Sequence, residues 1–106
     1  MSQISISKLQ EYIKSKDHQP DLKCEYFLKL TEEVGELSQA IRKNATPANE
    51  SSFKGTIEEE IYDVIYYALA IANCYDIEVE KWVYIKEKFN DKKYGRNLAD
   101  SLLHDQ

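Results

Sequence analysis

The chain has 106 residues, 42% of them hydrophobic and 31% charged, with a formal net charge of −5. This length predicts one domain, spanning residues 1–106, with a single core. The sequence contains no cluster of basic residues that would offset the acidic charge. This argues against a protein that binds the phosphate backbone of nucleic acid. Only three Gly and two Pro punctuate the sequence, which favours long helices over many short strands.

The N-terminal sequence MSQISISKLQEY lacks a charged region followed by an apolar one. No apolar run reaches the roughly 18 residues that cross a bilayer. We therefore expect a cytoplasmic protein without membrane contact. Cys24 and Cys74 lie singly in helical patterns without CxxC spacing, so we expect two buried, reduced thiols rather than zinc ligands.

Helical periodicity predicts a first helix over about residues 6–15 and, after the break at Pro20, a second helix that runs to about Lys43. The second helix carries an apolar stripe at alternating steps of three and four, which we expect to face the core: Phe27, Leu30, Val34, Leu37 and Ile41. Residues 44–54 are rich in Asn, Thr, Pro and Ser and are expected to form a loop.

A third helix is expected to begin at a capping box formed by Thr56 and Glu59 and to end near Asp76. Between residues 61 and 72 only Asp63 is charged, so this helix has to be covered on nearly every side. A chain this short can hardly do that alone, which predicts a homodimer or homotetramer with the third helix near its centre. A tightly wrapped monomer is the alternative. A tyrosine-rich face suits such an interface, made of Tyr62, Tyr66 and Tyr67.

A fourth helix is expected over residues 78–94, with Val79, Trp82 and Phe89 toward the core and Gly95 at its end. The last ten residues are expected to add a short helix or to fray. The predicted fold is all-α: a four-helix bundle-like protomer, assembled as a dimer or a dimer of dimers.

Two acidic pairs at spacing i, i+3 stand beside the apolar stripes of the second and third helices. These pairs are Glu33 with Glu36 and Glu60 with Asp63. Residues three apart share a helix face, so both pairs converge on one pocket when the two helices pack through their stripes. Partly buried carboxylates are costly unless they are protonated or bound to a cation. The sequence therefore predicts a divalent-metal site; for Asp63 a structural salt bridge is the alternative.

Ligands that are all oxygens point to Mg²⁺, with Mn²⁺ as a possible substitute, and the absence of a Glu-x-x-His motif argues against a di-iron bundle. Mg²⁺ sites commonly keep positions open for water and substrate phosphates. The fourth helix carries Lys86, Asn90 and Lys93 along one polar face. This face is either a solvated stripe or a set of donors for the phosphates of a metal-bound substrate.

The segments LTEEVGELSQAIRKN and GTIEEEIYDVIYYALAIANCYDI, followed by KEKFNDKKYGR, resemble the MazG-like nucleotide pyrophosphohydrolases of the all-α NTP pyrophosphohydrolase superfamily. The resemblance covers about residues 22–96. It rests on an EExxE motif ending at Glu36, an ExxD motif from Glu60 to Asp63, and a counterpart of the KxxxNxxR element. Lys93 stands where the family often has Arg, and it offers a point charge instead of a bidentate contact.

The resemblance implies Mg²⁺-dependent cleavage of a nucleoside triphosphate between its α and β phosphates, in the service of dNTP pool house-cleaning. It implies Glu33, Glu36, Glu60 and Asp63 as metal ligands, and a dimer or tetramer with its sites near subunit contacts. Glu33 or Glu36 is expected to accept the proton of the attacking water. Two alternatives stay open: a non-enzymatic helical module for assembly or metal binding, and a phosphoribosyl-ATP pyrophosphohydrolase-like activity.

Overall fold

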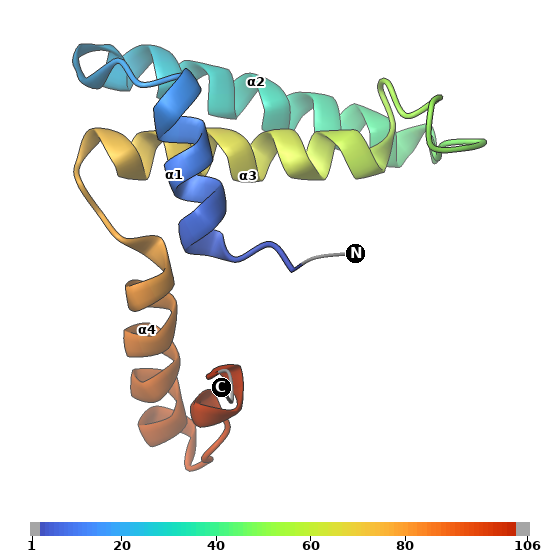
Figure 1. Cartoon of the computed structure of the whole chain (residues 1–106). Coiled ribbons are helices and arrows are strands. Elements are labelled where there is room, and N and C mark those ends of the chain that lie inside the picture. Colours follow the sequence, from blue (N-terminus) through green and yellow to red (C-terminus); the bar gives the residue numbers. More distant parts are fainter. Residues whose placement is uncertain (1–2, 104–106) are drawn as a thin grey trace.

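The computed structural model describes residues 3–103, which form four α-helices and two short 3-10 helices without any strand (Figure 1). The elements are, in chain order, α1 (Ile6–Lys16), η1 (Pro20–Leu22), α2 (Lys23–Arg42), α3 (Ile57–Cys74), α4 (Val79–Tyr94) and η2 (Ala99–Leu102). The predicted all-α class is confirmed. Within the C-terminal tail, η2 is the expected short helix, and residues 104–106 lie outside the described part of the chain.

α2 and α3 form an antiparallel hairpin, and α1 crosses the C-terminal half of α3 (Figure 1). A backbone hydrogen bond joins the two ends of the loop between α2 and α3: Ile57 N–H donates to the Ala45 carbonyl at 2.9 Å. Thr56 is the N-cap as predicted, since its Oγ1 accepts from Glu59 N–H at 3.3 Å. The reciprocal bond differs from a capping box, because Glu59 Oε1 accepts from Gly55 N–H at 2.6 Å, one residue before the cap. The start of α3 is thereby fixed against the end of α2.

The core is small and lies where α1 crosses α3. Its buried apolar residues are Ile13, Tyr26, Leu69, Ala70 and Cys74. The Tyr26 hydroxyl donates to Asp17 Oδ1 at 2.7 Å, and the Tyr66 hydroxyl donates to Asp17 Oδ2 at 3.0 Å, so the polar ends of both rings are satisfied. These contacts hold α1 against the start of α2 and the second half of α3.

The face of α2 that packs against α3 differs from the predicted stripe. The buried residues of α2 are Tyr26, Glu33 and Ala40, each seven residues from the next. The predicted core residues Phe27 and Val34 are 57% and 50% exposed, and Ile41 is also exposed. The prediction that these three residues lie in the core was wrong, because each residue one position earlier is the buried one. Hydrophobic periodicity missed this seam because one of its members is the carboxylate Glu33.

Three further side chains depart from expectation. Cys24 is exposed, so its predicted burial was wrong, whereas Cys74 is buried as expected. Trp82 and Phe89, predicted to face the core, are 54% and 60% exposed, because α4 does not lie along the α2–α3 hairpin (Figure 1). It extends away from the end of α3 and packs against η2 and the start of α1. Gly95 ends α4 with φ of 64°, as a C-terminal glycine commonly does.

The chain is more open than a compact domain of its size. Its radius of gyration is 16.2 Å, whereas a compact domain of this length has about 13 Å. Its accessible surface is 8249 Å², about 2,100 Å² more than a typical 12.4 kDa monomer exposes. Much of the excess is apolar side chains on α2, α3 and α4. None of the helices in the described region is both long and apolar enough to cross a bilayer.

Candidate metal centre

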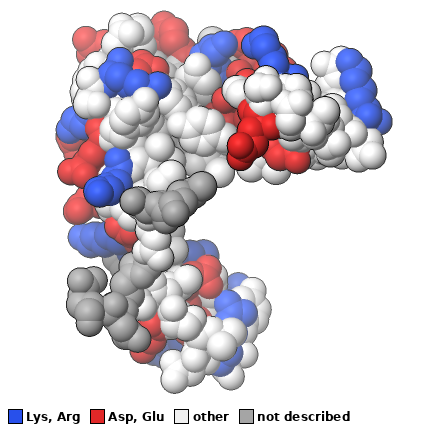
Figure 2. Space-filling model, turned by 45° about the vertical axis from the view of Figure 1, so that its right-hand side comes forward, with Lys and Arg blue, Asp and Glu red and all other residues white. Residues whose placement is uncertain are grey.

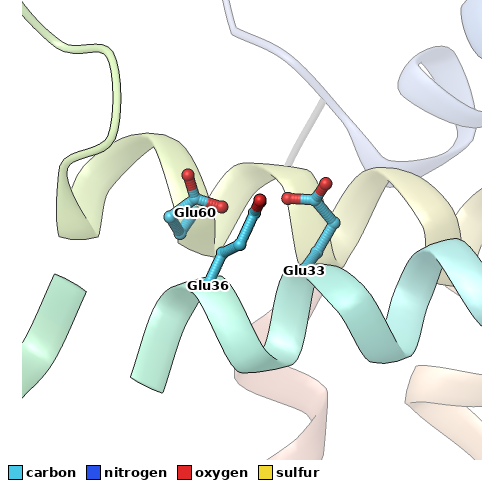
Figure 3. A group of neighbouring side chains, drawn as sticks. All are labelled: Glu33, Glu36 and Glu60. Carbon is cyan, nitrogen blue, oxygen red and sulfur yellow. The ribbon is translucent and has the colours of Figure 1, made fainter. Parts of the chain in front are cut away.

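Neighbouring turns of α2 and α3 bring three glutamates together. Glu33 and Glu36 extend from α2 and Glu60 from α3, and one carboxylate oxygen of each lies within 4.8 Å of the others. In Figure 3 the three side chains converge on the space between the two helices. The spacing i, i+3 on α2 gives both of its carboxylates the same direction.

Asp63 joins this cluster from the next turn of α3. Oxygens of Glu59, Glu60 and Asp63 also lie within 4.8 Å of one another, so Glu60 belongs to both groups. The structure therefore brings together all four carboxylates selected from the sequence and adds a fifth, Glu59. The sequence carried a signal for it, since Glu59 and Asp63 are four residues apart and share a helix face. From the sequence, Glu59 is predicted only as part of the cap of α3.

Burial divides the cluster into an inner and an outer part. Glu33 and Glu60 are buried, with 8% and 6% of their surface exposed, Asp63 is half-buried, and Glu36 is exposed. The Oε2 atoms of Glu33 and Glu60 are buried without a hydrogen-bond partner. Among residues 3–103, no lysine, arginine or histidine forms an ion pair with any of these four carboxylates. The inner carboxylates thus have no ion-pair partner in the described part of the chain.

The pKa values reflect this arrangement. Burial, followed by the neighbouring carboxyls of Glu60 and Glu36, raises the pKa of Glu33 to about 8. Burial also raises the pKa of Glu60, and the charges of Glu36 and Asp63 add to the effect. The pKa of Asp63 is raised by burial and then by the charge of Glu59. Burial and mutual repulsion make these three converging acids costly to ionise without a cation, which indicates a cation-binding site.

The donor set fits a hard divalent cation. Every candidate ligand is a carboxylate oxygen, and two of these oxygens are buried and unpartnered. A cation would offset the negative charge of these acids and would give both buried oxygens a partner. The exposed Glu36 leaves one side of the cluster open to water and to a ligand. The alternative of a structural salt bridge at Asp63 has no support, since Asp63 has no ion-pair partner among the described residues.

The three predicted phosphate-binding residues lie on α4 and are not joined to the carboxylates within this chain. Lys86 Nζ lies 5.3 Å from the centre of the Phe89 ring, and Asn90 Nδ2 donates to Glu87 Oε2 at 3.3 Å. Lys93 lies over the ring of Tyr94. α4 leaves α3 at its far end, and the 14 residues from Glu60 to the end of α3 span about 21 Å.

An antiparallel helical hairpin in this all-α protein thus holds a carboxylate cluster that suits a divalent cation. Residues 23–96 match the MazG nucleotide pyrophosphohydrolase domain. Two crystal structures of iMazG from Vibrio DAT 722 share this fold. One is 44% identical with a TM-score of 0.81, over 88% of this chain and all of the other. The second is 43% identical with a TM-score of 0.78, over 83% of this chain and 99% of the other.

No functionally curated protein shows significant similarity to the sequence. The domain match covers most of the chain and the structural relatives are well above 30% identical. The chain belongs to the MazG nucleotide pyrophosphohydrolase family. It is a nucleotide pyrophosphohydrolase, and the resemblance seen in the sequence is confirmed.

Proposed function

We propose that the protein is a Mg²⁺-dependent nucleoside triphosphate pyrophosphohydrolase that cleaves between the α and β phosphates. The products are the nucleoside monophosphate and pyrophosphate. The observation that carries this proposal is the pair of buried, unpartnered oxygens on Glu33 and Glu60, within a cluster of acids with which no cationic side chain of residues 3–103 forms an ion pair. Family membership supports the reaction class. With this reaction we propose a role in clearing unwanted dNTPs from the cytoplasmic pool.

Each carboxylate has a role in this proposal. Glu33, Glu36, Glu60 and Asp63 would hold Mg²⁺, for which Mn²⁺ can substitute. When bound, the ion would neutralise phosphate charge and make water a better nucleophile. Glu36 is the exposed member and is reached by solvent, so we assign it as the group that accepts the proton of the attacking water. Glu33 is buried beneath it and is the second candidate for that role.

We further propose that the protein works as a homodimer, or as a homotetramer built from two dimers. The accessible surface of the chain exceeds that of a typical monomer of its mass by about 2,100 Å². This excess is comparable to the area that each partner buries in an obligate dimer, about 1,000–2,500 Å². Apolar side chains of α2 and α3 lie on the flank of the hairpin next to the α2–α3 seam and would form the contact. This apolar flank comprises Phe27, Val34, Ile41, Ile61 and Ile65, each at least 44% exposed. Tyr66 and Tyr67, by contrast, are half-buried within the chain.

The decisive experiment is a substrate panel assayed for pyrophosphate release. Canonical and modified dNTPs, rNTPs and phosphoribosyl-ATP are incubated with the protein in Mg²⁺, in Mn²⁺ and in EDTA. We expect pyrophosphate and the monophosphate from one or more dNTPs, and no turnover in EDTA. Orthophosphate in place of pyrophosphate, or turnover in EDTA, would contradict the proposal. Turnover confined to phosphoribosyl-ATP would move the substrate assignment to that compound.

A further inference from the structure

Glu59 bonds the first turn of α3 to the end of the α2–α3 loop. Its Oε1 accepts from Gly55 N–H at 2.6 Å, so one carboxylate oxygen reaches back beyond the N-cap residue Thr56. Gly55 has φ of 76°, a left-handed conformation that glycine adopts at little steric cost. A charged acceptor makes this hydrogen bond stronger than a bond between neutral groups. The position of the last loop residues therefore depends on Glu59.

The same carboxylate belongs to the metal cluster. An oxygen of Glu59 lies within 4.8 Å of oxygens of Glu60 and Asp63. Glu59 is half-buried, whereas Glu60 is buried and keeps its Oε2 atom without a hydrogen-bond partner. A carboxylate has two oxygens with several lone pairs, so Glu59 can bind a cation with one oxygen while the other accepts from Gly55 N–H. Glu59 thus connects the cation site to the loop.

Lys54, the residue before Gly55, brings a positive charge to this end of the cluster. Its side chain is exposed and forms no ion pair with any residue between 3 and 103. Burial and then the charge of Glu59 raise the pKa of Asp63, and the positive charge of Lys54 opposes this rise. Lys54 therefore lies within electrostatic range of Asp63, while its ammonium group stays available to a ligand.

The arm formed by the α2–α3 hairpin carries charges of both signs. In Figure 2 acidic side chains gather on this arm, and basic side chains lie further toward its tip. A nucleoside triphosphate adds several negative charges to a cluster that is already acidic, and one divalent ion does not balance them all. A lysine ammonium offers three donors to phosphate oxygens, and its flexible stem lets it follow a bound ligand. The loop lysine thus supplies positive charge that the loaded site still needs.

We propose that Glu59 is a positioning residue that couples the α2–α3 loop to the cation site, and that Lys54 thereby binds a phosphate of the substrate. With a cation in place, Glu59 is fixed between the ion and Gly55 N–H, and Lys54 is kept beside Asp63. The inference rests on the proposed function for the identity of the ligand. It makes metal loading and capture of the triphosphate two coupled events.

Amide hydrogen exchange at Gly55 tests the coupling without any turnover. NMR follows this N–H in wild type, Glu59→Gln and Glu58→Gln, in EDTA and in Mg²⁺ at one pH. Glutamine keeps an oxygen for Gly55 N–H but loses the charge that holds the cation, whereas Glu58 is exposed and lies outside the cluster. We expect Mg²⁺ to slow the exchange about tenfold in wild type and in Glu58→Gln, but not in Glu59→Gln.

Calorimetry of Mg²⁺ binding to the same three proteins separates a failure of the coupling from a failure of the metal site. A wild type that binds Mg²⁺ without slower exchange at Gly55 would overturn the coupling and leave the proposed function in place. Equal slowing in wild type and Glu59→Gln would do the same. A wild type that binds no Mg²⁺ would refute the proposed function, and the coupling with it.

Steady-state kinetics at saturating Mg²⁺ test the role of Lys54. Lys54→Ala is expected to raise KM for the nucleoside triphosphate about tenfold, while the Mg²⁺ affinity of the nucleotide-free protein stays the same. Lys54→Arg is expected to recover most of the loss, because it keeps the charge. Lys43→Ala removes an equally exposed lysine at the end of α2 and should behave like wild type. An unchanged KM in an active Lys54→Ala variant would overturn the assignment.

A double-mutant cycle shows whether the two residues act together. Because Glu59 acts by positioning Lys54, the variant with both Glu59→Gln and Lys54→Ala is expected to have a KM close to that of Lys54→Ala alone at saturating Mg²⁺. Increases in KM that multiply, as they do for independent sites, would overturn the coupling.

Discussion

The carboxylates of Glu33 and Glu60 approach each other across the α2–α3 seam, and each keeps its Oε2 atom buried without a hydrogen-bond partner. Two acids in this position are costly to ionise together unless a cation lies between them. This relationship links the stability of the fold to pH and to metal, and the first prediction follows from it.

The stability of the metal-free protein is expected to fall as pH rises. Folding raises the pKa of Glu33 from 4.5 to about 8, so the protonated acid stabilises the fold below pH 4.5 and this contribution is lost toward pH 8. The effect is on the order of a few kcal/mol. Thermal unfolding in EDTA from pH 5 to 8 measures it. Mg²⁺ is expected to raise Tm more at pH 8 than at pH 5, and equal shifts at both would contradict the metal site.

Replacing Glu33 by Gln separates charge from shape. The amide removes the buried negative charge, so we expect the metal-free variant to be more stable than wild type at pH 8 by about 1–3 kcal/mol. Its stabilisation by Mg²⁺ is expected to shrink. Denaturant unfolding with and without Mg²⁺ checks both effects. The matched control is Glu32→Gln on the exposed face of α2, which should change neither.

Asp63→Asn is expected to abolish turnover while the helical fold persists. The amide keeps the size of the side chain but weakens its hold on a cation, so kcat should fall by more than the 10- to 100-fold typical of losing an outer partner of a metal ligand. Pyrophosphate release gives the rate, and far-UV circular dichroism the fold. Activity close to wild type would remove Asp63 from the site.

Gln10→Met is expected to loosen α4. Methionine keeps the volume but leaves Val79 N–H and the Ile77 carbonyl without their partner, at a cost of about 1–3 kcal/mol. Trp82 lies on α4 and is the single tryptophan of the chain, so its fluorescence anisotropy reports the motion of this helix directly. We expect lower anisotropy and a higher KM. Gln39→Met, on the exposed surface of α2, serves as the control; equal behaviour of the two variants would refute a role for Gln10.

The apolar flank is expected to mediate self-association. A charge at Val34 or Ile65 would be buried without a partner in the assembly, so Val34→Glu and Ile65→Glu should shift the protein toward monomer. Sedimentation equilibrium measures the shift. Ser51→Glu in the α2–α3 loop adds the same charge away from this flank and should leave the assembly unchanged. A wild-type protein that sediments as a monomer would contradict the proposed dimer.

The sequence was sufficient to predict the helices, because capping boxes and apolar periodicity are local signals. It also selected Glu33, Glu36, Glu60 and Asp63, since i, i+3 spacing fixes which residues share a helix face. It could not identify the buried seam of α2, because Glu33 occupies a position that periodicity reserves for apolar residues. The direction of α4 was equally hidden. It depends on hydrogen bonds between Gln10 and Val79, which are 69 residues apart.

The bond between Ile57 N–H and the Ala45 carbonyl closes the α2–α3 loop at its base. Because this bond links the end of α2 directly to the start of α3, the loop residues between Ala45 and Ile57 do not set the distance between Glu36 and Glu60. Extra residues inserted around Asn49 would lengthen the loop without altering the distance between those two glutamates. Closing a longer loop costs only about 0.6 kcal/mol for each doubling of its length. The segment is therefore the place where this protein can accept insertions or new recognition elements and still retain its metal chemistry.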